Sequence, residues 1–326
     1  MKNNIRVQTY LISIILIFLL YFVLLFTLGS DGYYSTIIIN ILIYVLFAVS
    51  LNMTVGIMGQ LSLGHAGFIA VGAYAGAYFT KLMMASQLPG LLQLIISSLI
   101  GGLFAALFGF LIAIPTLRLK GDYLAIITLA FGEIIKFTLQ NLEFLGGASG
   151  MKSIPILDTF SNVYWIVVIC VILITMLLTS RQGRTMLSIR EDEIAAENIG
   201  ISTNRVKLFG FTMSAFFAGI GGSLLAHNIS ILQPAKFSFV FSIDILVMVV
   251  LGGLGSITGA SIAATVLTIL NEVLRQYSEW RYFIYALALI LIMIFRPTGI
   301  LGTKEFTVSG IIKKIKNRTK KSELGG

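Results

Sequence analysis

The longest strongly charged segment of this chain, Arg181–Lys207, has residue types that suit the binding of another protein. It lies between two apolar runs, each near the roughly 20 residues that a helix needs to cross a bilayer. A group of charged residues begins a predicted helix, whose acidic first turn suits the positive end of the helix dipole: Arg190, Glu191, Asp192 and Glu193. A small apolar face and a glycine stop follow: Ile194, Ala195, Ala196, Ile199 and Gly200. Such a helix could enter a groove on a partner, although the same residues could also form a solvated loop.

The sequence shows no arrangement for catalysis. There is no Ser/His/Asp or Cys/His set and no pair of carboxylates in a catalytic context, which argues against an enzyme. The chain lacks a G-x-x-x-x-G-K-[ST] phosphate loop, so it cannot bind ATP by that route. Cys170 is the only cysteine and lies in an apolar run, and neither histidine has a metal-ligating neighbour at a suitable spacing. We therefore expect no disulfide, redox or metal chemistry.

Two glycine-rich segments, Gly56–Phe68 and Leu251–Ser261, interrupt apolar runs at corresponding places in the two halves of the chain. Each follows a similar lead-in, INIL at Ile39–Leu42 and IDIL at Ile243–Leu246, which indicates a divergent two-fold internal repeat. Paired breaks of this kind are pointers to a transporter's pathway, because broken helices aim unpaired backbone groups at a central cavity. The candidate pathway residues are Gln60, Ser62, Gly64, His65, Asp244, Gly252, Gly253 and Gly255. Glycine can instead serve close helix packing, as we expect for Gly72–Gly76.

Ionisable residues inside the apolar runs need an explanation, because a charge at the membrane centre costs about 3 kcal/mol. Glu133 and Lys136 stand three residues apart, so we predict a structural pair on one helix face. Glu272 and Arg275 have the same spacing near a helix end, and we predict an interfacial pair. For Asp244, a pathway role and an interhelical hydrogen bond both remain open.

The two histidines lie in different settings. His65 stands inside the first glycine-rich segment, where it could contact a zwitterionic solute or act as a neutral hydrogen-bond anchor for the broken helix. We favour the anchor. His227 lies near the end of an apolar run, and we predict an interfacial position for it.

Membrane helices are the elements that must position these residues. Hydrophobic residues make up 57% of the chain and charged residues 11%, and the mean hydropathy is +0.95. Recurring apolar runs predict an all-α polytopic membrane protein with about ten transmembrane helices, some of which could be broken or re-entrant. The predicted spans are approximately 10–28, 35–57, 62–82, 90–115, 122–142, 161–179, 208–227, 240–254, 258–274 and 281–296.

Basic residues gather at the junctions between the predicted spans. With the N-terminus inside, ten crossings place Arg118, Lys120, the charged segment and the basic tail 303–326 on the cytoplasmic side. We therefore attribute the net charge of +9 to topology and anionic lipid rather than to nucleic acid. The run 10–28 is predicted to be a retained helix and not a secretory signal. With ten crossings, both glycine-rich breaks lie at the cytoplasmic ends of their helices. If the breaks lay at the membrane midplane instead, the topology would differ, and the sequence leaves both arrangements open.

From about Ile37 to Gly302 the chain resembles a known family through motifs that are specific in combination. They are LNMTVGIMGQLSLGHAGFIAVGAYAGAY (Leu51–Tyr78), GDYLAIITLAFGEI (Gly121–Ile134), GRTMLSIREDEIAAENIGI (Gly183–Ile201), SAFFAGIGGSLLA (Ser214–Ala226), VLGGLGSITGA (Val250–Ala260) and RPTGILG (Arg296–Gly302). Together they are similar to the membrane subunits of bacterial branched-chain amino-acid ABC importers, of the LivM type.

The resemblance implies a permease that pairs with a homologous second permease and moves its solute by alternating access. A periplasmic or lipid-anchored solute-binding protein would sit on one side, and two cytoplasmic ATPases, which bind ATP and Mg, on the other. We expect no cofactor in this chain itself. Residues 1–302 would form the transmembrane permease domain of a multi-pass protein in the bacterial inner membrane, with the cytoplasmic tail 303–326 after it and both termini in the cytoplasm.

In ABC importers a cytoplasmic coupling helix often carries an E-A-A-x-x-x-G pattern. Ala195, Ala196 and Gly200 match it, while Ile194 replaces the glutamate and Glu193 lies one position earlier. The resemblance therefore implies a coupling role for the helix more than for one acidic contact.

Two alternatives to branched-chain amino-acid import remain open. Related permeases for urea or short amides share segments like GQLSLGH and GGLGS. In a different class, an ion-coupled secondary amino-acid carrier would use Asp244 or Glu133 as its protonatable group, and the charged segment would be only a linker.

Overall fold

The computed structural model describes residues 15, 17–25, 32–84, 88–116, 119 and 121–277, and isolated positions 283, 284, 286, 287, 290, 294, 299 and 302. The chain divides into two compact units, one of Thr36–Thr303 and the other of Met1–Ser35 with Lys304–Gly326. The larger unit holds the features discussed below. The predicted tail 303–326 lies outside the described residues, so the boundary at residue 302 stays a prediction.

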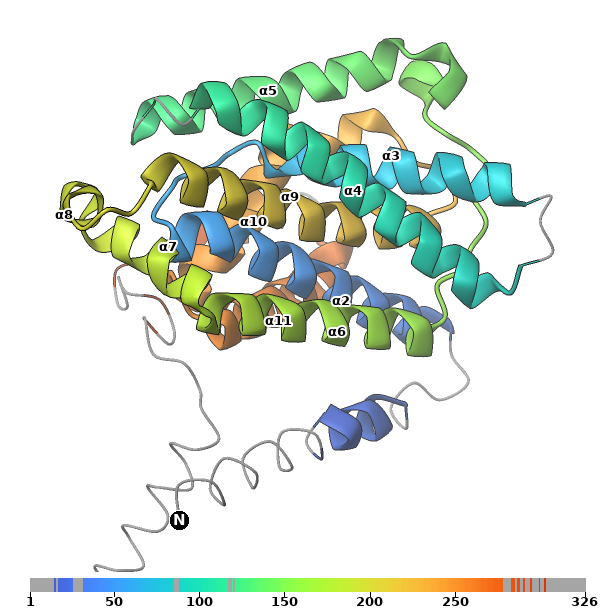
Figure 1. Cartoon of the computed structure of the whole chain (residues 1–326). Coiled ribbons are helices and arrows are strands. Elements are labelled where there is room, and N and C mark those ends of the chain that lie inside the picture. The colour runs from blue at the N-terminus through green and yellow to red at the C-terminus, as the bar shows by residue number, and fades with distance from the viewer. Residues whose placement is uncertain are drawn as a thin grey trace, which may run out of the picture. The chain divides into compact units, whose positions relative to one another are not determined.

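Helices make up nearly all the described secondary structure (Figure 1). Within the described residues, β pairing is limited to one isolated bridge between Met151 and Leu232. The α-helices are α2 (Gly32–Asn52), α3 (His65–Met83), α4 (Gly90–Thr116), α5 (Asp122–Asn141), α6 (Phe160–Thr179), α7 (Arg181–Glu191), α8 (Glu193–Asn198), α9 (Thr203–Asn228), α10 (Phe239–Gly252) and α11 (Ile257–Val273). Shorter elements are the π-helical turn η1 (Met53–Ile57) and the 3-10 turns Glu143–Leu145, Gly147–Ser149, η4 (Pro234–Phe237) and Leu274–Gln276.

The helices are those of a multi-pass membrane protein. Among the described residues, helical stretches long and apolar enough to cross a bilayer are Gly32–Ile57, Gly90–Thr116, Phe160–Thr179 and Thr203–Asn228, and α10 and α11 are shorter apolar helices. Each predicted span from 35–57 to 258–274 coincides with a helix. The predicted spans 10–28 and 281–296 lie partly outside the described residues, so the count of ten is not tested.

Small residues allow α9 to pack closely against α3 and α4, its neighbours in Figure 1. A Cβ atom at Gly72 would lie 2.3 Å from the backbone of Gly219, and one at Gly219 would lie 2.4 Å from the side chain of Ala105. A Cβ atom at Gly76 would approach the Ser223 hydroxyl to 2.2 Å. The expected packing role of Gly72–Gly76 is therefore confirmed, since larger side chains would separate the helices.

Both predicted structural pairs are present. Glu133 forms an ion pair with Lys136, and its other carboxylate oxygen accepts a hydrogen bond from the backbone N–H of Phe239 at 2.9 Å. Glu133 thus ties α5 to the first turn of α10. Arg275 and Glu272 form an ion pair at 3.1 Å, with 68% of the arginine side chain exposed.

His227 is not exposed, and its predicted position at the membrane interface stays a prediction. The residue is fully buried in the last turn of α9, where its Nε2 lies 2.9 Å from the Thr80 hydroxyl of α3. Its Nδ1 lies 2.7 Å from the carbonyl oxygen of Ser223. Position near a span end did not determine exposure, because α3 covers this face of α9.

Candidate functional site

The charged segment folds as two short helices, not as the single helix that the sequence predicted. Arg190 and Glu191 end α7, and Asp192 breaks the helix with an extended backbone conformation. The Asp192 carboxylate then accepts hydrogen bonds from the N–H groups of Ile194 and Ala195, at 2.9 and 3.0 Å. An N-terminal cap of this kind is the favoured role of aspartate, so α8 begins at Glu193, three residues later than predicted. Gly200 stops it with a φ of +87°, as expected.

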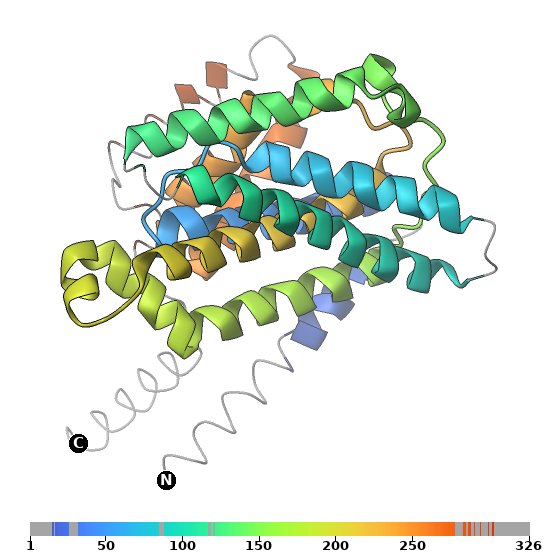
Figure 2. The ribbon, with the colours of Figure 1, turned by 45° about the horizontal axis from the view of Figure 1, so that its top comes forward.

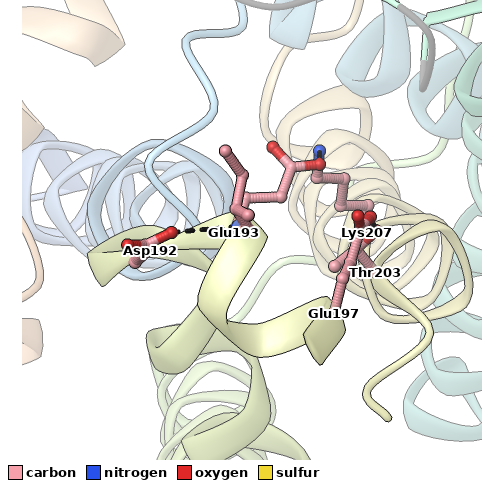
Figure 3. Close-up of polar contacts among 6 residues, drawn as sticks. Asp192, Glu193, Glu197, Thr203 and Lys207 are labelled. Atoms are coloured by element: carbon pink, nitrogen blue, oxygen red, sulfur yellow. Dashed lines mark hydrogen bonds and ion pairs between the residues drawn. The ribbon is translucent and has the colours of Figure 1, made fainter. Parts of the chain in front are cut away.

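Polar contacts hold α8 against the start of α9 (Figure 3). The Lys207 ammonium lies 2.5 Å from the Glu193 carboxylate, and only 4% of the lysine side chain is exposed. The Thr203 hydroxyl donates a hydrogen bond of 2.6 Å to the Glu197 carboxylate. Removing one partner of a buried ion pair leaves an uncompensated charge, so α8 is firmly attached to α9.

The predicted apolar face of α8 points in two directions. Ala196 is 3% exposed and packs inward, whereas Ala195 is exposed and Ile194 and Ile199 are 69% and 76% exposed. The segment projects from one end of the helix layer in both views of the ribbon (Figure 2). Two exposed isoleucines on a projecting six-residue helix form an apolar surface suited to a partner's groove.

Arg190 connects this segment to both glycine-rich breaks. Its guanidinium donates a hydrogen bond of 2.6 Å to the carbonyl oxygen of Gly56. A Cβ atom at Gly255 would lie 2.9 Å from the same guanidinium nitrogen, and one at Gly59 would lie 3.1 Å from the Arg190 side chain. The absence of side chains at these glycines makes room for the arginine. Both breaks therefore lie at the end of the helix layer that carries α7.

The first break begins where α2 continues into η1. Gly59 then adopts a φ of +68°, and the N–H of Gln60 donates back to the carbonyl of Thr54 at 2.9 Å. The next residues rest on α5: the N–H of Leu63 donates to the Thr128 hydroxyl at 3.1 Å, and a Cβ at Gly64 would meet the Thr128 carbonyl at 2.2 Å.

His65 begins α3 at the end of this break. It is 1% exposed, and its Nε2 lies 2.9 Å from the hydroxyl of Ser50 in α2. The N–H of Ala66 donates to the Ser242 hydroxyl of α10 at 2.9 Å. This geometry is that of an anchor between helices, while contact with a solute stays a prediction, as it does for Gln60 and for the buried Ser62.

The second break is a tighter turn between α10 and α11. Gly253 and Gly255 have φ values of +114° and +93°, which L side chains rarely adopt. Gly252 packs so closely on the start of α11 that a Cβ there would lie 2.5 Å from the N–H of Ala260. The Ser256 hydroxyl caps α11 by accepting a hydrogen bond from Gly259 N–H at 3.0 Å.

Asn52 joins the two breaks, and sequence reasoning missed it. Its side-chain amide donates to the Ser256 carbonyl and accepts from the Gly255 N–H, both at 3.0 Å. The residue is fully buried. An amide inside a long apolar run was the signal that could have identified it, since buried polar groups must be hydrogen-bonded.

Asp244 is half-buried in α10. A pathway role and an interhelical hydrogen bond both stay predictions for this residue.

These contacts join α8 to α9 and α7 to the two breaks. A displacement of α8 would act on α9 through Lys207, and a displacement of α7 would act on both breaks through Arg190.

Comparison with known proteins defines the family. Residues 33–295 match the family model described as "Branched-chain amino acid transport system / permease component". The chain belongs to this family. It is 37% identical over 298 residues to the "High-affinity branched-chain amino acid transport system permease protein LivM" of Escherichia coli (strain K12), covering 80% of this chain and 68% of that protein.

More distant relatives include a second kind of permease. The chain is 27% identical to the permease protein LivH of Salmonella typhimurium, covering 80% of this chain and 92% of that protein. It is 24% identical to a "Probable branched-chain amino acid transport permease protein LivM" of Methanocaldococcus jannaschii, covering 84% and 94%. No solved structure matches the chain.

Proposed function

We propose that this chain is a membrane-spanning permease subunit of an ATP-driven ABC importer for branched-chain amino acids. Family membership supports the transport role. The observation that carries the coupling role is the α7–α8 segment, which exposes apolar side chains, is bonded to α9 and to Gly56 of the first break, and places Arg190 beside Gly255 of the second. This chain would hold no cofactor, and ATP and Mg would bind to the partner ATPases.

The proposed coupling has two branches. An ATPase that receives Ile194, Ala195 and Ile199 in a groove would move α8 as its own surface moves. The Glu193–Lys207 ion pair would pass that motion to α9, and Arg190 would pass it to the breaks. Because tightly packed helices have few alternative arrangements, such a motion would shift whole helices rather than dissipate locally.

The proposed assembly follows from the relatives and the geometry. Proteins named LivM and LivH both resemble this chain, which supports pairing with a homologous second permease. Two ATPases would dock on the α7–α8 side of the permease pair. That side, the tail and both termini would be cytoplasmic in a bacterial inner membrane, in keeping with the basic residues predicted there. A solute-binding protein would deliver the amino acid to the opposite side.

The test is uptake of radiolabelled leucine into proteoliposomes that contain this chain, its partner permease, the ATPases and the binding protein. We expect uptake only with ATP on the ATPase side and only with the binding protein. Entry of urea or an amide but not leucine would support the mechanism and reject the substrate. Uptake by this chain alone on an ion gradient would reject the importer in favour of a secondary carrier.

A further inference from the structure

A cavity of about 600 Å³ lies at the other end of α9 from the α7–α8 segment. Its walls come from the first half of α2, the last turn of α9, η4, α10 and the end of α11. The 26 residues of α9 span ~39 Å at 1.5 Å per residue, so one rigid helix connects the cavity with the coupling end. The volume is within the range of about 300–1,000 Å³ that is usual for small-molecule sites.

The cavity wall carries side chains of opposite charge. Lys236 in η4 supplies an ammonium group, and Glu272 near the end of α11 supplies a carboxylate whose side chain is 29% exposed. Asn40 and Asn271 add amide groups to the lining. The side-chain oxygen of Asn40 already accepts a hydrogen bond of 2.9 Å from the side-chain amide of Asn228, and this bond holds α2 to the end of α9.

Aromatic and aliphatic side chains form most of the remaining wall. The ring of Phe241 packs edge-on against Tyr44 and against Phe237, with ring centroids 6.0 Å apart in both pairs. Leu225 and Met248, which are 9% and 1% exposed, line the same cavity. Edge-to-face aromatic pairs fix the positions of their rings, so this apolar surface is formed before any solute arrives.

We propose that this cavity binds the transported amino acid, with Lys236 on its carboxylate, Glu272 on its ammonium and the Tyr44–Phe241 wall on its branched side chain. The inference rests on the proposed function and deepens it by naming a solute site. The two charged groups of a zwitterionic amino acid would each face a side chain of opposite charge, and its apolar side chain would contact the aromatic wall. Urea has neither a charge nor an apolar group, so this chemistry selects an amino acid over the nearest alternative solute.

The position of the cavity fits delivery from outside the cell. The proposed docking of ATPases on α7–α8 puts the opposite end of α9 on the outer side, where a binding protein would release its solute. Because α9 contributes both to the cavity wall and, through Lys207, to the coupling end, a shift of this helix would change both sites together.

The experiment measures leucine uptake into proteoliposomes that contain the complete transporter. The binding protein is present at a saturating concentration, and ATP is supplied on the ATPase side. We expect Lys236→Gln and Glu272→Gln each to lower the maximal uptake rate by tenfold or more, and Glu272→Asp to retain part of it. Arg275→Gln is the matched control for Glu272→Gln, because it removes the same ion pair but leaves the carboxylate in the cavity wall. Lys152→Gln is the control for Lys236→Gln, because it removes an exposed lysine from a loop.

The outcomes separate this proposal from the proposed function. Uptake that falls in the cavity variants but stays within threefold of wild type in both controls supports the solute site. If the wild type takes up leucine and each cavity variant has the same maximal uptake rate as its control, the proposed solute site is wrong but the proposed importer function is still supported. If the wild type takes up no leucine with ATP, both proposals are wrong. Co-purification of all subunits with each variant verifies that assembly is intact.

Discussion

The two ends of α9 are built in different ways. At the coupling end, the contacts that hold α8 come from residues close in sequence, as in the bond between Thr203 and Glu197 or the ion pair between Lys207 and Glu193. At the cavity end, the wall is assembled from segments spread between Ile37 and Glu272. The proposed partner surface is therefore encoded in one short segment, whereas the proposed solute site needs residues from four helices and η4.

The charges at the two ends also differ. The acids of α8 and its cap are engaged: Asp192 caps the helix, Glu193 pairs with Lys207, and Glu197 accepts from Thr203. At the cavity end, Glu272 pairs with Arg275, 68% of whose side chain is exposed. The carboxylate oxygens of Asp158, in the loop before α6, are buried without a hydrogen-bond partner among the described residues.

The largest effect is expected from Arg190→Ala, which would disconnect the coupling end from both breaks. The variant loses the 2.6 Å hydrogen bond to the Gly56 carbonyl, and hydrogen bonds to charged groups contribute about 1.5–3 kcal/mol. We expect ATP-driven uptake to fall by at least tenfold while ATP hydrolysis continues, and Arg190→Lys to restore part of the uptake. Measurement of both rates in proteoliposomes checks this; equal loss of hydrolysis and uptake would point to failed assembly instead.

Ala195→Arg tests whether the exposed side of α8 is the docking surface. We expect the variant to insert normally but to lose co-purification with the ATPases, since a bulky charge would replace a small contact in a groove. Ala196→Arg should also lose association, but through unfolding of α8, because Ala196 is 3% exposed. Ile156→Arg, which changes an exposed residue outside this segment, is the control. Normal co-purification of the ATPases with Ala195→Arg would contradict the docking role of α8.

Asn52→Leu and Asn228→Leu compare how much the joined breaks and the cavity end contribute to the stability of the protein. Asn52→Leu removes both side-chain bonds and leaves the partly buried Gly255 N–H without its acceptor, at a cost of about 1–3 kcal/mol. The Ser256 carbonyl keeps the hydrogen bond from the Ala260 N–H at 3.1 Å. The control is Asn228→Leu, which removes one partly buried bond at the cavity end. We expect Asn52→Leu to lower the melting temperature in detergent clearly more than Asn228→Leu; equal effects would contradict a special role for the joined breaks.

The smallest effect is expected from Asp158→Asn. Burial raises the pKa of the Asp158 carboxyl well above its usual range. A raised pKa in the folded state means that the stability contribution is present below the unfolded value, about 3.9, and is lost as the pH rises toward the folded value. The variant should therefore gain stability over wild type as the pH rises from 4 toward neutrality. Thermal melts across that range test it, and a difference that stays constant or shrinks with pH would contradict the prediction.

Much of the fold could be predicted because the signals for it are local. Apolar runs of membrane length gave α2 to α6 and α9 to α11 within about five residues, and the positive φ of Gly200 follows from its place just after the C-cap of α8. The start of α8 was missed although its signal was local too, since Asp192 is a preferred N-cap.

The partners of the buried polar residues could not be predicted in the same way. Asn52 and Ser256 are 204 positions apart, and no local pattern states that they meet. The same holds for His227, whose burial depends on α3.

The sequence by itself determined the class of protein, the positions of the apolar helices from α2 to α11 and the location of the charged segment, because hydrophobicity, capping and charge act over a few neighbouring residues. Only the tertiary structure decided that the two breaks touch, that Ala195 faces outward while Ala196 faces inward, and that Lys236 and Glu272 line one cavity. These features depend on how helices distant in sequence pack, and packing is set by the fit of whole surfaces to one another.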